Sequence, residues 1–564
     1  MHELIQKLIA RLPLDFRVLY RQFLLRVIDL ESLSIEADVA GFLGQFAGVL
    51  IMLSMVHATV AYLGYTFITE PADRLAFCLH MEHYLIATTM LVIWLVTVIG
   101  WDATFPDRRD VMVLSPLPIA PHTILFAKVS ASGAVLGLAI LTLNVASGVI
   151  LPLLMGAQPG PAWGFFQSLP SWWFTIIAAS AFLYCSVLTI QGFTALLLPR
   201  RFFLRLSAFL QLAAFGLFLG VYFVQPPVTS PAQMAAPENH WILASSPSYW
   251  FFALFNQLDG SLPSPFRWVA TRAWIGLALA VFGAISSLLL CYLHTMKKTV
   301  EQPDLVPGAG GVHWMPSFGN SLQTAISLFS IRSLMRSRQH RVAFSFYLAF
   351  VFGLAFSLLH SELAVAGPTP LTTDFLIPSF LMMFFAVLGL RNVFSLPISL
   401  TANWVLRTTQ LRPTVKYVET TRRSLVLLAV LPIWLMTAAL SLRLRPVQQV
   451  AGHLAALALL GCILVELSLI GFYKVPFTCS YLPGKANIQL IFWGSLIVLV
   501  AVVVPSVESE LRALQDPFKF VCMASFLLAG FSALWLFNRY QAKSAVIYFE
   551  EIPDEVITTL KLSV

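Results

Sequence analysis

Charged residues are what this sequence has least of. Only 11% of its 564 residues are Asp, Glu, Lys or Arg, whereas 58% are hydrophobic and the mean hydropathy is +0.81. A soluble protein needs a largely polar exterior, which this composition cannot supply. Runs of about 20 apolar residues match the thickness of the hydrocarbon core of a bilayer. The composition therefore predicts an all-α polytopic membrane protein.

Motifs for catalysis and nucleotide binding are missing as well. The string nearest to a P-loop, CSYLPGKAN at 479–487, lacks the first glycine, and Ala486 replaces the hydroxyl residue that binds magnesium. The sequence contains no HExxH, no G-x-S-x-G and no zinc-finger spacing, and its six cysteines form no CxxC pair. We therefore expect this chain not to be an enzyme and to hold no metal or cofactor of its own.

The apolar runs predict about 12 transmembrane helices, with both chain ends on the same side of the membrane. Most of the 35 Lys and Arg residues fall in inner loops if the N-terminus is inside. The positive-inside rule then predicts cytoplasmic termini in a cell inner (plasma) membrane. The net charge of +8 is thus a topology signal, and we expect no nucleic-acid partner. The predicted spans are 41–66, 84–100, 126–155, 172–198, 206–224, 273–294, 343–360, 375–390, 425–442, 449–473, 489–506 and 518–538.

The two halves of the chain have the same order of segments. Residues 16–28 place apolar side chains at helical spacing with arginines off that stripe, which predicts an amphipathic helix lying flat against membrane lipids. Packing of this helix on another cytoplasmic segment is the alternative. Residues 321–341 are its counterpart. We expect a six-span half at 1–300, a Pro/Gly-rich linker at 301–320 and a second six-span half with a cytoplasmic tail at 321–564.

One polar loop interrupts the apolar sequence in each half. The first, WDATFPDRRDVMVLSPLPIAPHTILFAK at 101–128, contains four prolines, and its string VLSPLPIAPHTIL resembles VFSLPISLTANWVL at 393–406. Proline fixes φ and charged side chains make charge-assisted contacts, so we expect rigid surfaces that contact a soluble partner. A solvated loop without a partner is the alternative. The candidate coupling residues are Asp107, Arg108, Arg109, Asp110, Pro116, Leu117, Pro118, Pro121, Leu396, Pro397, Asn403 and Trp404.

Few ionisable residues lie within the predicted spans. Glu466 is inside the tenth span, where a carboxylate must face a cavity or a partner. It is interpreted either as a proton relay or substrate contact, or as a structural ion pair or hydrogen bond between helices. His453 lies near the other end of that helix and is not expected to be its partner. The string HMEHY places His80, Glu82 and His83 just before the second span, where a metal cluster is possible and a solvated surface is favoured.

An aromatic outer loop precedes the sixth span. Residues 225–272 contain HWILASSPSYWFFALFNQL, which predicts short helices that dip back into the outer leaflet. Aromatic side chains concentrate at membrane interfaces. We expect that position for Trp241, Tyr249, Trp250, Phe251 and Phe252.

Over residues 15–300 the order of interfacial helix, two spans, polar loop and span resembles the permease subunits of the ABC type-2 exporter family. The loop follows the pattern D-x-x-x-L-x-x-L-P-[IV]-x-P-x-T-[IL]…K, matched here by Asp110, Leu114, Leu117, Pro118, Ile119, Pro121, Thr123, Ile124 and Lys128. In that family the loop forms a coupling helix that docks on a separate ATPase, and a re-entrant segment precedes the sixth span. The second half lacks the Asp and the second Pro, and its last outer loop, 507–517, is too short for two re-entrant helices.

The resemblance implies a fused permease with coupling elements at 107–128 and 392–416. Its partners would be two copies of a cytoplasmic ATP-binding subunit, which would carry ATP and Mg, together with membrane lipids. Because lipid-facing aromatic loops suit such cargo, we expect an amphipathic substrate. An ion-coupled secondary transporter that uses an intramembrane carboxylate is the alternative function. A membrane-embedded enzyme that uses His80, Glu82 and His83 is a further alternative.

Overall fold

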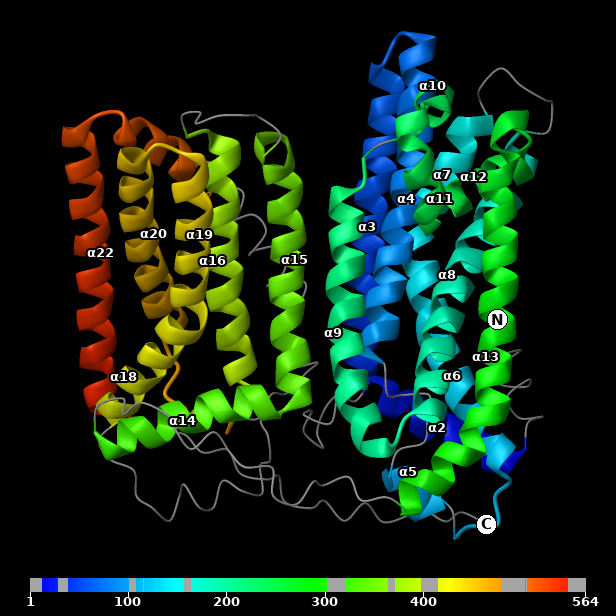
Figure 1. The fold of residues 1–564 in the computed structure, drawn as a ribbon, viewed down its shortest axis with the longest axis horizontal. Coiled ribbons are helices and arrows are strands. Elements are labelled where there is room, and N and C mark those ends of the chain that lie inside the picture. Colours follow the sequence, from blue (N-terminus) through cyan, green and yellow to red (C-terminus); the bar gives the residue numbers. More distant parts are fainter. Residues whose placement is uncertain are drawn as a thin grey trace. The chain divides into compact units, whose positions relative to one another are not determined.

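The computed structural model describes residues 13–28, 39–100, 108–114, 116–156, 164–226, 228–301, 320–363, 371–396, 414–478, 503 and 505–545. Over these ranges every regular element is a helix (Figure 1). The chain divides into two compact units. Unit 1 comprises Met1–Leu30, Val39–Phe218 and Gln225–Ala309, and unit 2 comprises Glu31–Asp38, Leu219–Val224 and Gly310–Val564. The predicted linker, 301–320, lies almost entirely outside the described residues.

Ten helices among the described residues are long and apolar enough to cross a membrane. The chain is therefore an all-α, multi-pass membrane protein, as its composition predicts. These helices coincide with all but two of the predicted spans. The predicted span at 206–224 falls on a helix whose apolar part, Phe209–Phe223, is shorter. The predicted span at 489–506 lies almost wholly outside the described ranges.

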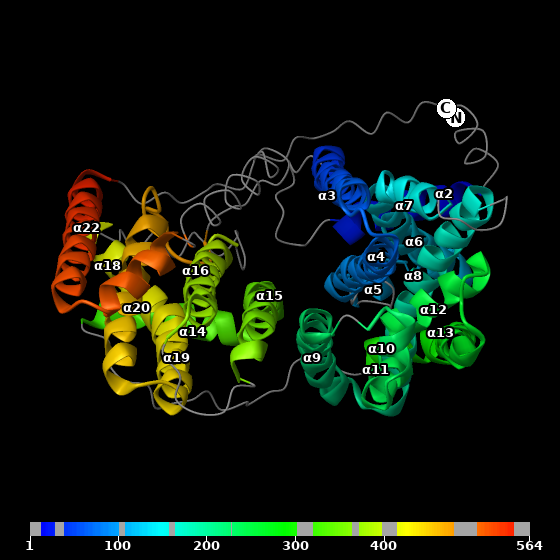
Figure 2. The same ribbon diagram turned by 90° about the horizontal axis from the view of Figure 1, so that it is seen from above.

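Unit 1 is built around α4 and α8, which pack on each other and on several neighbours. Seen from above, α4 lies among α3, α6, α8 and α12 (Figure 2). The helices of this unit are α2 (Leu14–Ile28), α3 (Val39–Phe67), α4 (Pro71–Ile99), α5 (Arg108–Leu114), α6 (Pro121–Asn144), α7 (Ser147–Gly156), α8 (Gly164–Leu197), α9 (Arg200–Val224, as far as Phe218), α10 (Pro231–Ala235), η1 (Pro237–Asn239), α11 (His240–Ser245), α12 (Pro247–Asp259), η2 (Ser264–Phe266) and α13 (Arg267–Glu301).

Unit 2 packs α16 against α15 and α20, with α14 crossing one end of the unit (Figure 1). Its helices are α14 (Ser321–Arg336), α15 (Arg338–Leu363), α16 (Thr373–Phe394), α18 (Thr414–Leu425), η4 (Val426–Val430), α19 (Leu431–Leu444), α20 (Val447–Ser468) and α22 (Pro517–Ser544). Residues 505–514 are also helical, where the sequence predicts an outer loop.

The third predicted span, 126–155, is in fact two helices. The chain leaves α6 at Asn144 and restarts as α7 at Ser147. The hydroxyl of Ser54 on α3 accepts hydrogen bonds from the backbone N–H groups of Ala146 and Ser147 at 3.0 and 3.2 Å. The side chain thus satisfies backbone donors at the break, which allows a helix to be interrupted inside an apolar bundle.

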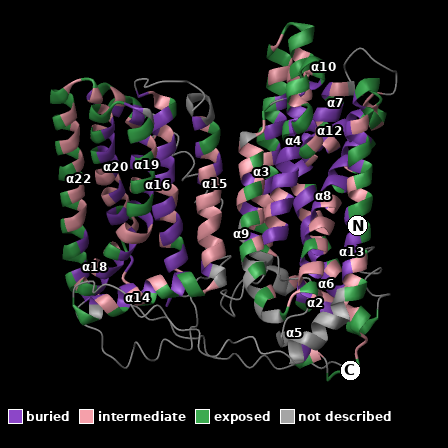
Figure 3. Cartoon of the chain, in the orientation of Figure 1, coloured by how far each residue is buried: buried purple, intermediate pink, exposed green. Residues whose placement is uncertain are grey.

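Helix α12 forms the core of the aromatic loop before α13. Its side chains Tyr249, Phe251 and Phe252 are buried to 2% exposure or less, and the helix packs on α4, α8 and α13. Figure 3 shows α12 and α4 largely buried. The prediction of short helices in this loop is confirmed. Tyr249, Phe251 and Phe252 fill a protein core, whereas Trp241 on α11 is 68% exposed. The predicted position of these aromatics at the membrane interface stays a prediction.

Replacing Phe252 with Ala should destabilise the chain by about 3–5 kcal/mol, because it opens a cavity in a close-packed core. The measurement is thermal unfolding of the purified chain, followed by tryptophan fluorescence. Trp241→Ala, an exposed aromatic of the same loop, is the matched control and should shift the midpoint little. Equal shifts for the two variants would show that α12 is not the core of this loop.

Candidate functional site

The first predicted coupling loop forms a short helix followed by a proline turn. After α5, the backbone N–H of Leu117 donates to the carbonyl of Leu114 at 3.1 Å, and that of Ile119 donates to the carbonyl of Leu117 at 2.7 Å. Helix α6 then begins at Pro121, at a position where the missing N–H is not needed. Pro116, Leu117 and Pro118 are exposed. The turn is thus a stiff projection of the chain between α5 and α6.

One side of this loop is anchored and the other side is exposed. Val111 is buried where α5 packs against α13, and Leu114 and Ile119 pack on the cluster formed by α2 and α6. Met112 and Val113 are 64% and 65% exposed. The backbone of the predicted residues Arg108, Arg109 and Asp110 lies in α5, and Asp107 lies outside the described residues.

Helix α2 packs against α6 and against the anchored side of the loop. Its apolar stripe, which includes Leu19 and Phe23, packs against Ile124, Ala127 and Ala131 of α6. The buried ammonium group of Lys128 lies over the ring of Phe23, 5.2 Å from its centroid. The prediction of an amphipathic helix is confirmed. Its apolar face packs on α6, a spanning helix, which neither the lipid contact nor the alternative of another cytoplasmic segment had named.

At the start of the second predicted coupling region, two hydrogen bonds fix the backbone at the end of α16. The backbone carbonyl of Leu396 accepts a hydrogen bond from Nε2 of His340 at 3.0 Å, and the carbonyl of Phe394 accepts one from the N–H of Phe477 at 2.8 Å. Phe477 has a φ of 65°, a conformation that L-residues rarely adopt. The other predicted residues of this region, Pro397, Asn403 and Trp404, lie outside the described ranges.

Helix α18 begins directly after that region and continues into a π-helical segment, η4, and then α19. Pro432, at the start of α19, has no N–H to give to the turn before it. A π-helical turn is one way to accommodate such a gap, and these turns recur at functional sites. Figure 1 shows α18 directed away from the axis of α19 at this point. The chain thus has a bend between the predicted coupling region and a spanning helix.

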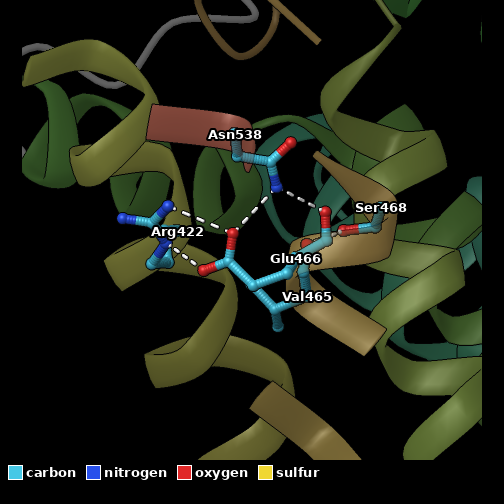
Figure 4. A network of polar contacts seen from close by, with 5 residues as sticks. All are labelled: Arg422, Val465, Glu466, Ser468 and Asn538. Carbon is cyan, nitrogen blue, oxygen red and sulfur yellow. Dashed lines mark hydrogen bonds and ion pairs between the residues drawn. The ribbon is translucent and has the colours of Figure 1, made fainter. Parts of the chain in front are cut away.

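Three helices meet at a buried polar network beside α18 (Figure 4). The carboxylate of Glu466 on α20 is fully buried and is ion-paired with the guanidinium of Arg422 on α18 through both of its oxygens. Asn538 on α22 donates from its amide nitrogen to Oε2 of Glu466 and to the Glu466 backbone carbonyl, both at 2.8 Å. The network therefore ties α18, α20 and α22 together at one end of unit 2.

This geometry favours the structural interpretation of Glu466. A carboxylate that holds an arginine and an amide donor has its charge compensated within the protein. His453 is not part of the network, as expected. Neighbouring bonds reinforce the junction: Arg391 of α16 donates from Nε to the carbonyl of Ser468 at 2.9 Å, and Thr414 donates to the carbonyl of Ala545 at 2.8 Å.

The HMEHY string lies inside α4, not before a span as predicted. Helix α4 begins at Pro71, so Glu82 and His83 fall in its interior and are buried, whereas His80 is exposed. The two buried side chains face different partners. Oε2 of Glu82 accepts from Asn256 of α12 at 3.2 Å. The His83 ring stacks on Tyr249 and bonds to Ser248 and Gln225. In the described part of the chain no His, Cys, Asp or Glu group has the geometry of a metal site.

The end of α12 carries a further buried contact. Ser168 of α8 donates a hydrogen bond to the carboxylate of Asp259. Burial raises the pKa of Asp259, and the Ser168 hydrogen bond offsets part of this rise. Together with the Glu82–Asn256 bond, this contact joins α12 to α4 and α8.

Sequence reasoning missed the partners of Glu466 and the buried role of Glu510. Arg422 belongs to the string TTRR just before the predicted ninth span, and Asn538 ends the predicted twelfth span, so neither stands out in a hydropathy profile. A usable signal existed for Glu510. Val507, Glu510, Leu511 and Leu514 share one helical face, whereas Glu508 and Arg512 form an i,i+4 pair on the other face.

No protein-family model matches this chain, and the comparisons with curated proteins and with solved structures find no match either. The functional argument therefore depends on the chain's own residues.

Removing one partner of the buried ion pair should destabilise the chain much more than removing both. Arg422→Met leaves the Glu466 carboxylate buried without its cation, which costs about 3–5 kcal/mol. The double variant R422M/E466L should recover most of that loss, because no unpaired charge is left. Thermal unfolding of the purified chain measures both variants.

The matched control is Glu419→Gln on the same helix, which removes one member of the exposed Glu419–Arg423 pair. We expect a change of about 1 kcal/mol or less, as is usual for surface pairs. A double variant that is less stable than R422M alone would contradict a mainly structural role for this ion pair.

Proposed function

We propose that this chain is the membrane-spanning permease subunit of an ABC-type exporter, moved by separate ATP-binding subunits that are present in two copies. The observation that carries the proposal is the loop after α4. It has an exposed apolar face at Met112, Val113 and Leu117 and an anchored face at Val111, Leu114 and Ile119. The sequence contains no P-loop motif, and we propose that the partner subunit binds ATP and Mg.

An exposed apolar face on a polar loop is typical of a protein interface. Leu117 is 46% exposed, and Met112 and Val113 of α5 are 64% and 65% exposed. Exposed apolar side chains grouped in this way are typical of the core of a docking surface. Because the opposite face packs on α2, α6 and α13, a push on the loop would displace whole helices rather than the loop alone.

The second coupling element would act through α18. This helix begins at Thr414, within the last residues of the region 392–416, and is fixed to α20 and α22 by the Glu466 network. It also contacts α14 through the bond between Arg423 and Gln323. The bend at η4 separates this anchored helix from α19. A displacement of the region 392–416 would move α18. This motion would be transmitted to α20 through the Arg422–Glu466 ion pair and to α19 through the continuous chain at η4.

The proposed mechanism is alternating access driven by closure of the ATPase subunits on nucleotide binding. No covalent step is assigned to this chain. We propose a location in the inner (plasma) membrane with the α5 end cytoplasmic, since the basic residues concentrate in those loops. The proposed amphipathic substrate has weaker support, because three of the loop aromatics expected to face lipid, Tyr249, Phe251 and Phe252, are buried in protein.

The alternative, a secondary transporter coupled through Glu466, has weaker support. A coupling carboxylate must bind and release its ion during each cycle. Glu466 is fully buried and holds Arg422 and Asn538, so its charge is committed to joining three helices.

Purification of the tagged chain from native membranes in mild detergent tests the proposal. Mass spectrometry should identify a P-loop ATPase in the purified complex. The amount of ATPase purified with the variant M112S/V113S/L117S should be lower by a factor of about ten or more. Loss of apolar anchors at an interface costs more than about 1.4 kcal/mol of binding free energy. Trp241→Ser changes an exposed aromatic of α11, a helix that lies at the end of unit 1 opposite α5 (Figure 1). This variant is the matched control and should retain the ATPase.

Size-exclusion chromatography of the triple variant should match that of the wild type, since the changed residues are exposed. Retention of the ATPase by the triple variant would move the docking surface away from this loop. If no ATPase is purified with the wild-type chain under conditions that keep membrane complexes intact, the permease assignment is refuted.

A further inference from the structure

A buried chain of three polar side chains lies in unit 2, away from the Glu466 network. Ser379 of α16, His453 of α20 and Glu510 of helix 505–514 are all 2% exposed or less. Nε2 of His453 is 3.0 Å from the Ser379 hydroxyl oxygen, and Nδ1 of His453 is 2.8 Å from Oε1 of Glu510. On α20, His453 and Glu466 are thirteen residues apart, roughly 20 Å at 1.5 Å per residue.

The order resembles a Ser-His-Glu triad, but the hydrogen bonds differ from those of a nucleophile. The Ser379 hydroxyl donates to the backbone carbonyl of Leu376 at 2.6 Å. Its single hydrogen is therefore used, and the oxygen can only accept from the histidine. In a hydrolase the serine proton must point toward the ring nitrogen. The arrangement instead requires Nε2 of His453 to carry a hydrogen.

The other ring nitrogen then determines how many protons the pair holds. Nδ1 and the carboxylate oxygen cannot both be bare at 2.8 Å, because two lone pairs would face each other. One proton must lie between them, whether the pair is written as imidazolium with carboxylate or as imidazole with carboxylic acid. In both forms the pair has no net charge. Without that proton it would carry a full negative charge at a buried position.

The surroundings offer little compensation for such a charge. Oε2 of Glu510 is buried and has no hydrogen-bond partner among the described residues, and the ring of Phe380 lies 6.2 Å from that of His453, centroid to centroid. The structure gives neither His453 nor Glu510 any other hydrogen bond or ion pair within the described ranges. Arg445 is buried beside Phe375, 4.6 Å from that ring's centroid. Other charged groups on the adjoining elements are Asp374 and Arg443, which are exposed, Glu508 with Arg512, and Asp516 with Lys519. Arg391 of α16 and Glu466 of α20 lie toward the other ends of their helices, where they bond to Ser468 and Arg422.

Helix 505–514 is the element free to respond to the proton. It contacts the bundle through one apolar face, with Val507, Leu511 and Leu514 in the cluster around α16. Its other face is exposed, since the Glu508 and Arg512 side chains are 52% and 78% exposed. A buried charge is relieved most easily by moving this surface helix outward, so that water reaches the carboxylate.

We infer that His453 and Glu510 form a proton-binding site, and that release of its proton detaches helix 505–514 from the bundle. When the proton leaves to water, His453 stays neutral with hydrogen on Nε2 and Glu510 becomes a carboxylate. The ligand is a proton, and the site gives unit 2 a pH-dependent opening. This inference goes beyond the proposed function and does not depend on an ATPase.

Hydrogen–deuterium exchange of the purified full chain tests the site. Protection factors, which already account for the intrinsic effect of pH on exchange, should be measured for amides 508–514 at a series of pH values from about 6 to about 9. The attached state of helix 505–514 binds one more proton than the detached state. At a pH where detachment releases that proton, the equilibrium constant for detachment therefore rises about tenfold per pH unit. The protection factors should fall by the same factor.

Glu510→Gln is the decisive variant. The Gln amide donates to Nδ1 of His453 without needing a proton, so the helix should stay closed and its protection should change less than about twofold over the same range. Glu508→Gln on the exposed face of the same helix is the matched control and should keep the wild-type slope. Glu510→Leu, which has no exchangeable proton, is a second variant that should also lose the slope.

Wild-type protection that does not depend on pH would overturn the inference. So would a wild-type slope in E510Q or E510L, or a lost slope in E508Q, since each would place the titrating group elsewhere. The experiment needs no partner protein, so its failure and that of the proposed function are distinguishable.

Discussion

The ion pair between Glu466 and Arg422 is the interaction on which the architecture of unit 2 depends most. A charge buried in an apolar bundle must be compensated where it lies, which fixes the position of the group that compensates it. Arg422 holds α18 against α20, and Asn538 brings α22 to the same carboxylate. Apolar packing alone would leave these helices free to slide, because lipid tails are as apolar as leucine side chains. The polar junction gives the three helices one register.

Unit 1 fixes its helices by a different combination of contacts. Polar bonds such as Glu82–Asn256 and Ser168–Asp259 attach α12 to α4 and α8, and the aromatic face of α12 fills the space between them. At the other end, the loop around α5 is held by apolar contacts to α2 and α6. The exposed side of that loop is therefore presented on a fixed base. A docking surface that must transmit force needs such a base, because a flexible loop would absorb the displacement.

Much of the fold could be predicted from hydropathy, because a bilayer requires spanning helices of about 20 apolar residues. The errors occurred where polar residues find partners inside the protein. Glu82 and His83 seemed to mark the outside of a span, yet they are interior residues of α4 with partners on α12 and beyond. The Glu466 network joins residues 44 and 72 positions apart in the chain, a pairing that no local pattern encodes. Periodicity gave the apolar stripe of α2 correctly but could not distinguish a lipid surface from a protein surface.

Helix α20 links two buried polar sites of opposite character. At one end, the charge of Glu466 is balanced by an arginine, which stays protonated at any accessible pH. At the other end, the charge of the His453–Glu510 pair is balanced by a proton, which can leave. A force applied to α18 would therefore reach α20 through a permanent bond. The contact of helix 505–514 with α20 is conditional on a proton. An element with one permanent and one releasable attachment can pivot about the first when the second opens, which gives unit 2 a specific way to change conformation without breaking its buried charge network.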